Sequence, residues 1–304
     1  MKAEKIWMDG KMVDWDEAKV HVCTHALHYG SGVFEGIRAY ETESGTAVFR
    51  LKEHIDRLFN SAKIFKMVIP YTKEEIREAI KDTIKVNKLK SGYIRPLIYR
   101  GFEQLGLNPF TCPVNCTIAV WEWGAYLGEE ALAKGIKTKI SSYARSYINS
   151  TSQKAKICGN YVNSIFAKME AIEAGVDEAI LLDTRGFVTE GSGENIFWIK
   201  NGIIYTTPTA TVLEGITRDS IIKIAEDMNY QFKEKYICRD ELYISDEVFF
   251  AGTAAEVTPI KEIDNYQIGK GKRGPITENI QKKFFAIAKG EEEKYLSWLD
   301  YISK

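Results

Sequence analysis

Apolar residues recur along the first part of the chain with the spacings of helices and strands. Apolar positions at i, i+4, i+7, i+8 and i+11 from Leu51 predict an amphipathic helix over residues 51–67. A second helix should begin at Thr72, because Glu75 three residues later completes a capping box. Short runs rich in β-branched and aromatic residues predict strands at 5–8, 36–40, 45–49, 93–99 and 116–123.

The same patterns continue in the second part of the chain. Asn201-Gly202 between two apolar runs predicts a tight β-hairpin. Further strands are expected at 136–142, 179–182, 195–199, 203–205 and 247–251, and further helices from about Thr217 and through 280–287. A helix over 161–174 should end at Gly175. Its large apolar residues recur at helical spacing and are expected to face inward: Val162, Ile165, Phe166, Met169 and Ile172.

The order of these elements favours an α+β fold in two domains, because strands and helices mix without regular βαβ alternation. The length of 304 residues also suits about two domains. Residues 122–128 contain two glycines and no apolar period, which predicts a boundary. We therefore expect a small domain over residues 1–120, an interdomain loop over 121–131 and a larger domain over 132–304.

Charge and cysteine content narrow the classes of protein. Lysine and arginine number 41 and aspartate and glutamate 42, so the net charge of −1 gives no reason to expect nucleic acid or an anionic membrane as partner. No apolar run approaches the ~18 residues that span a bilayer. Five cysteines, an odd number, in a chain with no apolar leader predict reduced thiols and a cytoplasmic protein. Cys112 and Cys116 lack a second ligand pair, so we expect no metal.

Four short segments can carry chemistry, and each has an ordinary structural alternative. Apolar neighbours around Lys156 favour an uncharged, nucleophilic amine, but a lysine at a strand end is usually solvated. Glu190, beside two glycines, can hold a protonated ring nitrogen or simply cap a turn. Residues 215–218 precede a helix and can seat an anion or act as a cap. Residues 252–255 can contact an oxyanion or form a β-turn.

Three further features are ambiguous when taken alone. The glycines of His28-Tyr-Gly-Ser-Gly-Val-Phe-Glu-Gly36 do not match a dinucleotide-binding loop and more often form a structural turn. Arg57 lies two residues from Ile55, opposite the apolar stripe, which predicts a solvated surface arginine. Tyr93 and Arg95 share one strand face, suited either to capturing a carboxylate or to an ion pair at the rim of the sheet.

Taken together and in order, these segments resemble the class IV aminotransferases, and most closely the branched-chain amino-acid aminotransferases. The resemblance extends from Trp7 to Leu299 and includes Lys156-Ile-Cys-Gly-Asn-Tyr161. The other matching segments are residues 28–38, 53–58, 93–96, 124–128, 189–195, 215–219 and 252–256. Each is weak alone, but eight in the right order are specific. One departure is that Ile157 and Cys158 are bulkier than the family's usual residues there.

The resemblance implies a fold-type IV enzyme that binds pyridoxal 5′-phosphate, with a small α/β domain and a larger pseudo-barrel domain for the cofactor. Lys156 would form the Schiff base with the cofactor's aldehyde and would also move the substrate's proton. Glu190 would pair with the pyridine nitrogen, and Tyr161 would bind the ring's phenolic oxygen. The cofactor's phosphate would be held by Arg57, Ile216, Thr217 and Thr253, a role that contradicts the surface interpretation of Arg57.

The resemblance also implies substrates and partners. Branched-chain L-amino acids would transfer their amino group to 2-oxoglutarate by a ping-pong mechanism. The substrate carboxylate would meet Tyr93, Arg95, Thr253 and Ala254. The apolar side chain would lie against Tyr29, Phe34, Gly36 and Tyr126. Tyr29 and the loop over 101–109 can reach a neighbouring subunit, so we expect a homo-oligomer, at least a dimer and possibly a hexamer. The alternative is another fold-type IV enzyme: a D-amino-acid aminotransferase, an R-amine transaminase or an aminodeoxychorismate lyase.

Overall fold

The computed structural model describes residues 3–124 and 128–302 and divides the chain into two compact units. Unit 1 comprises Met1–Trp123, Ala155–Tyr161 and Ile287–Lys304, and unit 2 comprises Gly124–Lys154 and Val162–Ala286. Each unit therefore draws on segments that are separated in the sequence. The domains expected from the sequence, at residues 1–120 and 132–304 with a loop over 121–131, stay a prediction.

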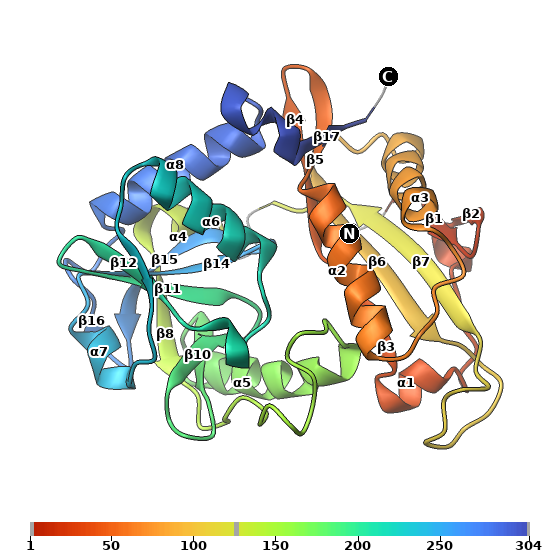
Figure 1. Ribbon diagram of the computed structural model, residues 1–304, viewed down its shortest axis with the longest axis horizontal. Coiled ribbons are helices and arrows are strands. Elements are labelled where there is room, and N and C mark those ends of the chain that lie inside the picture. Colours follow the sequence, from red (N-terminus) through yellow and green to blue (C-terminus); the bar gives the residue numbers. More distant parts are fainter. Residues whose placement is uncertain (1–2, 125–127, 303–304) are drawn as a thin grey trace. The chain divides into compact units, whose positions relative to one another are not determined.

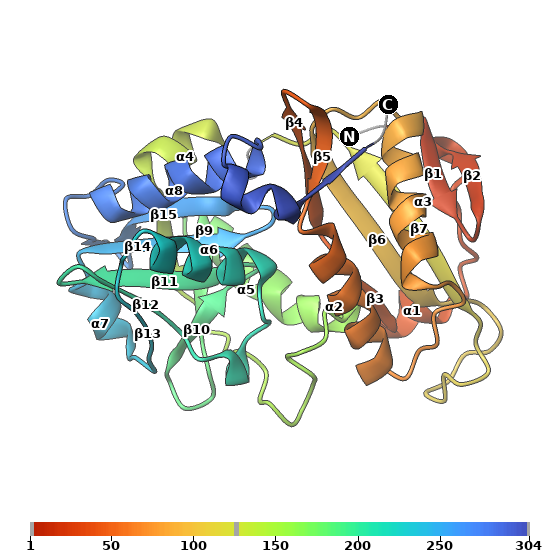
Figure 2. The ribbon, with the colours of Figure 1, turned by 45° about the horizontal axis from the view of Figure 1, so that its top comes forward.

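Unit 1 is built on an antiparallel sheet. Its strand order is β17-β5-β4-β6-β7-β1-β2, and β3 pairs with β6 (Figure 1). The strands are β1 (Lys5–Met8), β2 (Lys11–Asp14), β3 (Gly32–Phe34), β4 (Ile37–Thr42), β5 (Gly45–Phe49), β6 (Gly92–Arg100), β7 (Val114–Trp121) and β17 (Leu299–Tyr301). Helices α2 (Leu51–Ile64) and α3 (Lys73–Val86) lie together over one face of this sheet (Figures 1 and 2). The apolar stripes of both helices are buried in the core of this unit, and they include Ile55, Leu58 and Ile80.

The two helices of unit 1 follow their sequence signals closely. The Thr72 side chain accepts from the Glu75 N–H and the Glu75 side chain accepts from the Thr72 N–H, so the capping box is confirmed. Helix α2 ends three residues earlier than expected. Its end is a Schellman motif: Lys66 has a positive φ of 51°, and the Met67 N–H donates to the carbonyl of Ala62 at 2.8 Å. Shorter elements are α1 (His25–Tyr29), η1 (Trp15–Glu17), η2 (Cys158–Asn160) and η4 (Glu293–Trp298).

Unit 2 contains a sheet that closes on itself. The strands run β10-β9-β8-β15-β14-β11, and β10 also pairs with β11, which closes the circle. The strands of this unit are β8 (Ile136–Ile140), β9 (Glu178–Leu182), β10 (Val188–Gly191), β11 (Asn195–Lys200), β12 (Ile203–Thr206), β13 (Phe232–Glu234), β14 (Glu247–Gly252), β15 (Glu256–Ile263) and β16 (Tyr266–Gln267). The mixed α+β fold and its barrel-like larger part are confirmed. So is the hairpin at Asn201-Gly202, where both residues have positive φ.

The helices of unit 2 are α4 (Glu129–Lys134), α5 (Tyr161–Glu173), α6 (Ile216–Asp227), α7 (Arg239–Tyr243) and α8 (Pro275–Ala288), with a short turn η3 (Thr209–Thr211). Tyr161, the first residue of α5, belongs to unit 1. In the described chain, no helix is long and apolar enough to cross a membrane.

Helix α5 has its expected limits, but the expected orientation is wrong. Its buried residues are small: Ser164, Ala167 and Ala171. The two alanines pack against Ala179 and Leu181 of β9. Because the small side chains take the side facing the barrel, the large apolar ones face solvent. The residues expected to face inward are 46–61% exposed: Val162, Ile165, Phe166, Met169 and Ile172.

Candidate active site

Lys156 is held at both its backbone and its amine within unit 1. Its N–H donates to Ser61 Oγ of α2 at 3.0 Å, and its carbonyl accepts from the Phe34 N–H at 3.1 Å. The amine Nζ lies 2.6 Å from Tyr161 Oη and 5.0 Å from the centroid of the Phe34 ring. The lysine is therefore not freely solvated, because a hydroxyl and two aromatic rings fix the position of its amine.

The glycines of residues 28–36 allow close packing around this lysine. The Gly159 N–H donates to the Gly30 carbonyl at 3.1 Å, and a Cβ on Gly30 would lie only 2.7 Å from Gly159 Cα. Gly32 faces the bulky Cys158, whose Sγ would be 3.1 Å from a Cβ placed there. The glycine segment thus ends α1 at Gly30, continues into β3 and brings its backbone against residues 158–159.

Arg57 does not lie on the surface, and the helical-wheel expectation of a solvated arginine is wrong. Its Nε and Nη2 donate to Glu35 Oε1 and Oε2 at 2.7 and 2.8 Å, and its side chain is 13% exposed. His54 Nδ1 lies 2.7 Å from Glu35 Oε2, so the ring carries its proton on Nδ1 and donates. Glu35 has no solvent exposure. This carboxylate reaches Arg57 from a different segment, which helical spacing alone cannot reveal.

Burial alone would raise the pKa of Glu35. The charge of Arg57 and the hydrogen bonds from Arg57 and His54 outweigh burial and hold this pKa well below its ordinary value of 4.5. Burial lowers the pKa of His54, although the hydrogen bond and charge of Glu35 oppose it. A neutral imidazole, a carboxylate and a guanidinium therefore form one buried group, and the carboxylate fixes the plane of the guanidinium.

Tyr93, Arg95 and Phe34 form a second cluster in unit 1. Arg95 Nη2 donates to Tyr93 Oη at 3.2 Å, and the Arg95 guanidinium lies 4.6 Å from the centroid of the Phe34 ring. Gly36 is required beside them, because a Cβ there would lie 1.8 Å from Tyr93 Oη. The expected shared face of Tyr93 and Arg95 is confirmed, and it presents a cation beside apolar rings.

Two further residues were expected to border the substrate, Tyr29 and Tyr126. Tyr29 is 45% exposed on α1, and its ring packs against the rings of His25 and His28 at 4.7 and 6.2 Å. Its expected approach to a neighbouring subunit stays a prediction. Tyr126 lies outside the described residues.

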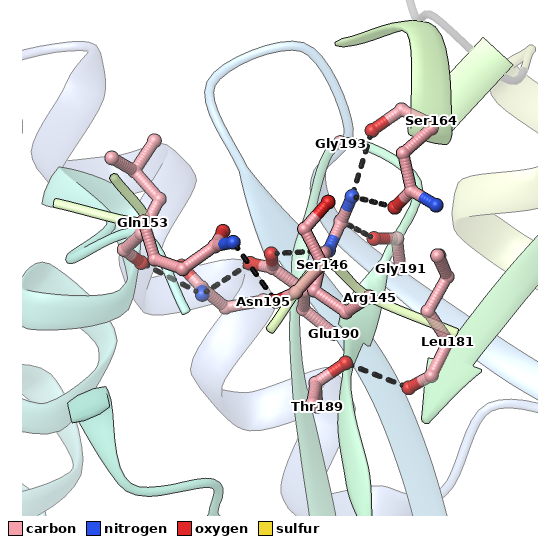
Figure 3. Close-up of polar contacts among 12 residues, drawn as sticks. Arg145, Ser146, Gln153, Ser164, Leu181, Thr189, Glu190, Gly191, Gly193 and Asn195 are labelled. Atoms are coloured by element: carbon pink, nitrogen blue, oxygen red, sulfur yellow. Dashed lines mark hydrogen bonds and ion pairs between the residues drawn. The ribbon is translucent and has the colours of Figure 1, made fainter. Parts of the chain in front are cut away.

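Glu190 of unit 2 is buried and held by an arginine that sequence reasoning missed. Arg145 Nε lies 3.0 Å from Glu190 Oε1, and Nη2 donates to the Gly191 carbonyl at 2.8 Å (Figure 3). Nη1 donates to Ser164 Oγ at 3.0 Å, which ties Arg145 to α5. Arg145 stands in an irregular segment that lacks periodicity or a motif, so no sequence signal marked it. The ion pair favours the ionised carboxylate at position 190.

Asn195 connects Glu190 with the beginning of α6. Its Nδ2 lies 3.5 Å from Glu190 Oε2 and donates to the Leu213 carbonyl at 3.1 Å. Gly215 follows, and a Cβ there would lie 2.0 Å from Asn195 Oδ1, so this position needs glycine. Gly215 caps α6 without a side-chain hydrogen bond, which leaves the first amides of the helix for another acceptor.

The remaining expected anion contacts lie at the beginning of α6 and in the next hairpin. Ile216 and Thr217 are the first two residues of α6 and both are buried. Thr253 and Ala254 are in the turn between β14 and β15 and are half-buried. Backbone amides at a helix N-terminus, together with the helix dipole, favour a phosphate.

Glu194 is a second buried carboxylate in unit 2. Its Oε2 accepts from the Gly193 N–H at 3.0 Å. Burial, together with the charges of Glu178 and Glu190, raises the pKa of Glu194 to about 8, against the opposing effects of the Gly193 N–H and Lys168. This side chain therefore tends to hold a proton near neutral pH.

Each unit thus supplies one part of the chemistry that a phosphorylated pyridine aldehyde requires. Unit 1 supplies an amine beside a hydroxyl, a fixed guanidinium and a cation among aromatic rings. Unit 2 supplies the Glu190 carboxylate paired with Arg145, which can hold a ring nitrogen in its protonated form, and helix amides suited to phosphate.

Comparisons with known proteins agree with this chemistry. The family described as Amino-transferase class IV matches residues 32–263. The branched-chain-amino-acid aminotransferase of Pseudomonas aeruginosa is 52% identical over 293 residues, covering 96% of this chain and 95% of that protein. The one of Escherichia coli (strain K12) is 46% identical over 305 residues, covering 100% of this chain and 99% of that protein.

Solved structures give the same result. A T.th. branched-chain amino acid aminotransferase, solved with pyridoxamine 5′-phosphate, has a TM-score of 0.97 and 52% identity, and 100% of each chain is covered. The Escherichia coli structure has a TM-score of 0.97 and 46% identity, covering 99% of this chain and 100% of that one. The chain belongs to the class IV aminotransferases and, within them, to the branched-chain-amino-acid aminotransferase family.

Proposed function

We propose that the chain uses pyridoxal 5′-phosphate to transfer the amino group of L-leucine, L-isoleucine and L-valine to 2-oxoglutarate. The products are branched 2-oxo acids and L-glutamate, and the first product leaves before the second substrate binds. The observation that carries the proposal is the Lys156 amine, held 2.6 Å from the Tyr161 hydroxyl in a chain of this family.

The residues present fit the cofactor. Lys156 would supply the amine that condenses with the aldehyde, and Tyr161 would be the hydrogen-bond partner of the phenolic oxygen. When bound, the cofactor accepts the electron pair left when the Cα–H bond of the amino acid breaks. Glu190 makes this possible by keeping the pyridine nitrogen protonated, and its own charge is maintained by Arg145 at 3.0 Å.

The phosphate is held by groups from several segments. Arg57 provides charge in an orientation that Glu35 fixes through two hydrogen bonds. The amides of Ile216 and Thr217 and the Thr253 hydroxyl provide the remaining contacts. The uncapped start of α6 supports this role, because its first amides need an acceptor.

Lys156 also acts on the substrate. With its amine free, Lys156 would be the base that removes the substrate's Cα proton and later returns a proton. Tyr161 lies within hydrogen-bond distance of this amine and keeps it in place.

The substrate's two ends need different surroundings. Tyr93, Arg95 and the amides of Thr253 and Ala254 bind the carboxylate. Phe34, Gly36, Tyr29 and Tyr126 border the branched side chain. L-Glutamate must occupy the same pocket with a charged side chain. Arg95 is suited to both substrates, because its cation can bind a carboxylate and also lies directly against the apolar Phe34 ring.

Two properties of the whole molecule complete the proposal. We propose a homo-oligomer, at least a dimer, because Tyr29 and the loop over 101–109 resemble segments that reach a neighbouring subunit. We also propose a cytoplasmic location, which the five free cysteines support.

A substrate panel tests the function. Purified holoenzyme is assayed for 2-oxoglutarate-dependent turnover of L-leucine, L-isoleucine, L-valine, D-alanine and 1-phenylethylamine, with Lys156→Ala as the inactive control. We expect turnover of the three branched L-amino acids. Turnover of D-alanine or the amine, with none of the branched L-amino acids, would reject the proposed substrate class.

A further inference from the structure

Arg218 is a buried cation in the first turn of α6, and it has no part in the proposed reaction. It is the third residue of the helix, and its side chain is 7% exposed. The positive end of the helix dipole lies at this turn, so a cation is disfavoured there and an anion is favoured. No group in the described part of the chain accepts a hydrogen bond from its buried Nε. A charge kept at this cost needs a specific reason.

The contacts of Arg218 tie the first turn of α6 to the ends of two strands. Its Nη2 donates to the Thr207 carbonyl at 3.0 Å and to Glu234 Oε1 at 2.6 Å. Thr207 directly follows β12, and Glu234 is the last residue of β13. These two strands are parallel neighbours in the sheet. One side chain thus fixes where the helix begins relative to the sheet.

The segment over residues 207–215, which leads into α6, has further anchors of the same kind. Asn195 Nδ2 donates to the Leu213 carbonyl at 3.1 Å, and Lys154 Nζ donates to the Thr209 carbonyl. These anchors, like the one at residue 207, use carbonyl oxygens of the segment. No side-chain hydrogen bond caps the helix that follows. The start of α6 is therefore held in place while its first amides keep their capacity for an acceptor.

Anion binding at a helix start benefits from amides that are in place before the anion arrives. Helix ends fray, and ordering them on binding costs conformational entropy. Fixed dipoles need no such reorganisation and therefore bind a charge more strongly. An anchor within the first turn, close to the amides themselves, is the most direct way to prevent fraying.

We infer that Arg218 is a positioning residue for the phosphate-binding start of α6. It holds the Ile216 and Thr217 amides in the orientation that binds phosphate, and it acts through the backbone, since its Nη2 is committed to Thr207 and Glu234. Its charge also reinforces the positive end of the helix dipole, so a bound anion offsets the cost of burying it. The inference rests on the proposed binding of pyridoxal 5′-phosphate and adds a residue to it.

Two ligands that differ only in the phosphate isolate this role. Pyridoxal 5′-phosphate and pyridoxal share the ring and the aldehyde, so the ratio of their dissociation constants reports the contribution of the phosphate. A general loss of folding lowers the fraction of chain that can bind and raises both apparent constants by the same factor. A merely structural effect of a substitution therefore cancels in the ratio.

Arg218→Gln is compared with Arg273→Gln, a matched control in the same unit. Arg273 also donates to a backbone carbonyl, that of Leu132 at 3.3 Å, and pairs with a partly exposed glutamate, Glu278, at 3.1 Å. It lies just before α8, not in α6. Equilibrium dialysis of the cofactor-free full-length chains gives both dissociation constants, and circular dichroism confirms that each variant is folded.

We expect the unsubstituted chain and Arg273→Gln to prefer pyridoxal 5′-phosphate over pyridoxal by the same factor. Arg218→Gln should reduce this factor by about 10-fold, the scale of an anion's interaction with a helix start. An unchanged factor in Arg218→Gln, or an equal reduction in Arg273→Gln, would overturn the inference and leave the proposed function standing. An unsubstituted chain without any preference for the phosphorylated ligand would overturn both.

Arg218→Lys keeps the test decisive if Arg218→Gln does not fold. Lysine retains the cation, but its shorter side chain and single terminal nitrogen do not reproduce the two contacts of the arginine. The preference for the phosphorylated ligand should fall by about 3-fold, less than in Arg218→Gln, because the charge remains. A folded Arg218→Lys chain with an unchanged preference would overturn the inference.

Discussion

Replacing Glu35 with glutamine should destabilise the fold and weaken cofactor binding together. The carboxylate is fully buried and accepts two hydrogen bonds from Arg57 and one from His54. Glutamine has nearly the volume of glutamate but no charge. An amide nitrogen, which donates hydrogen bonds, replaces one of the two carboxylate oxygens that accepted them. Arg57 is then a largely buried cation without its carboxylate. Removing one partner of a buried ion pair costs about 3–5 kcal/mol, so we expect a loss of about 3 kcal/mol in the free energy of unfolding.

The pH dependence gives this prediction a distinctive sign. The folded-state pKa of Glu35 lies below its ordinary value of 4.5. Its contribution to stability is therefore complete above about pH 4.5 and is lost as the pH falls towards the folded-state pKa. Glu35→Gln has no such group. The stability difference between the unsubstituted chain and the variant should be constant near neutral pH and should shrink on acidification below 4.5.

Urea unfolding of the cofactor-free chain at several pH values measures this difference. Glu78→Gln is the control: it lies on α3 and pairs with Lys81 at 2.9 Å, but its side chain is 54% exposed, so it should cost less than ~1 kcal/mol. Equilibrium dialysis should show weaker binding of pyridoxal 5′-phosphate by Glu35→Gln alone. A loss no larger than that of Glu78→Gln, or a difference that does not change with pH, would refute the reasoning.

Three further predictions concern single groups. Glu190→Gln should still bind cofactor but lower turnover at least ~100-fold, because it no longer keeps the ring nitrogen protonated; near-normal steady-state turnover would contradict this role. Arg57→Ala should mainly weaken cofactor affinity by removing a charge-assisted phosphate contact, and an unchanged cofactor dissociation rate would contradict it. Burial raises the pKa of Glu194 to about 8, so the unsubstituted chain should lose stability as the pH rises from 4.5 to about 8, by on the order of 2–5 kcal/mol. Glu194→Gln should remove this loss, and parallel stability curves for the two proteins would contradict the prediction.

Local sequence signals predicted local structure well. The capping box at Thr72 and the hairpin at Asn201-Gly202 depend on hydrogen bonds and φ values within a few residues, and both are present. Periodicity did not predict that β10 and β11 close the barrel. Only the family resemblance implied a barrel, because pairing between strands depends on the whole sheet.

Errors arose where a distant segment decides the environment. Spacing on α5 correctly found an apolar face, but it could not show that Ala167 and Ala171 are the residues that pack against β9. Helical spacing placed Arg57 on the surface because Glu35, 22 positions away, was not part of the pattern. Arg145 gave no signal, since its role depends on tertiary contacts with Glu190 and Ser164. The resemblance identified the remaining site residues, which local chemistry had left ambiguous.

The central claim is that Lys156 is the lysine that carries the cofactor. Borohydride reduction of the holoenzyme would fix the cofactor to the amine that holds it, and peptide mass mapping would then locate the modified residue. We predict one modified peptide containing Lys156, and none from the Lys156→Ala variant. Stoichiometric modification of any other lysine in the unsubstituted chain would contradict the account.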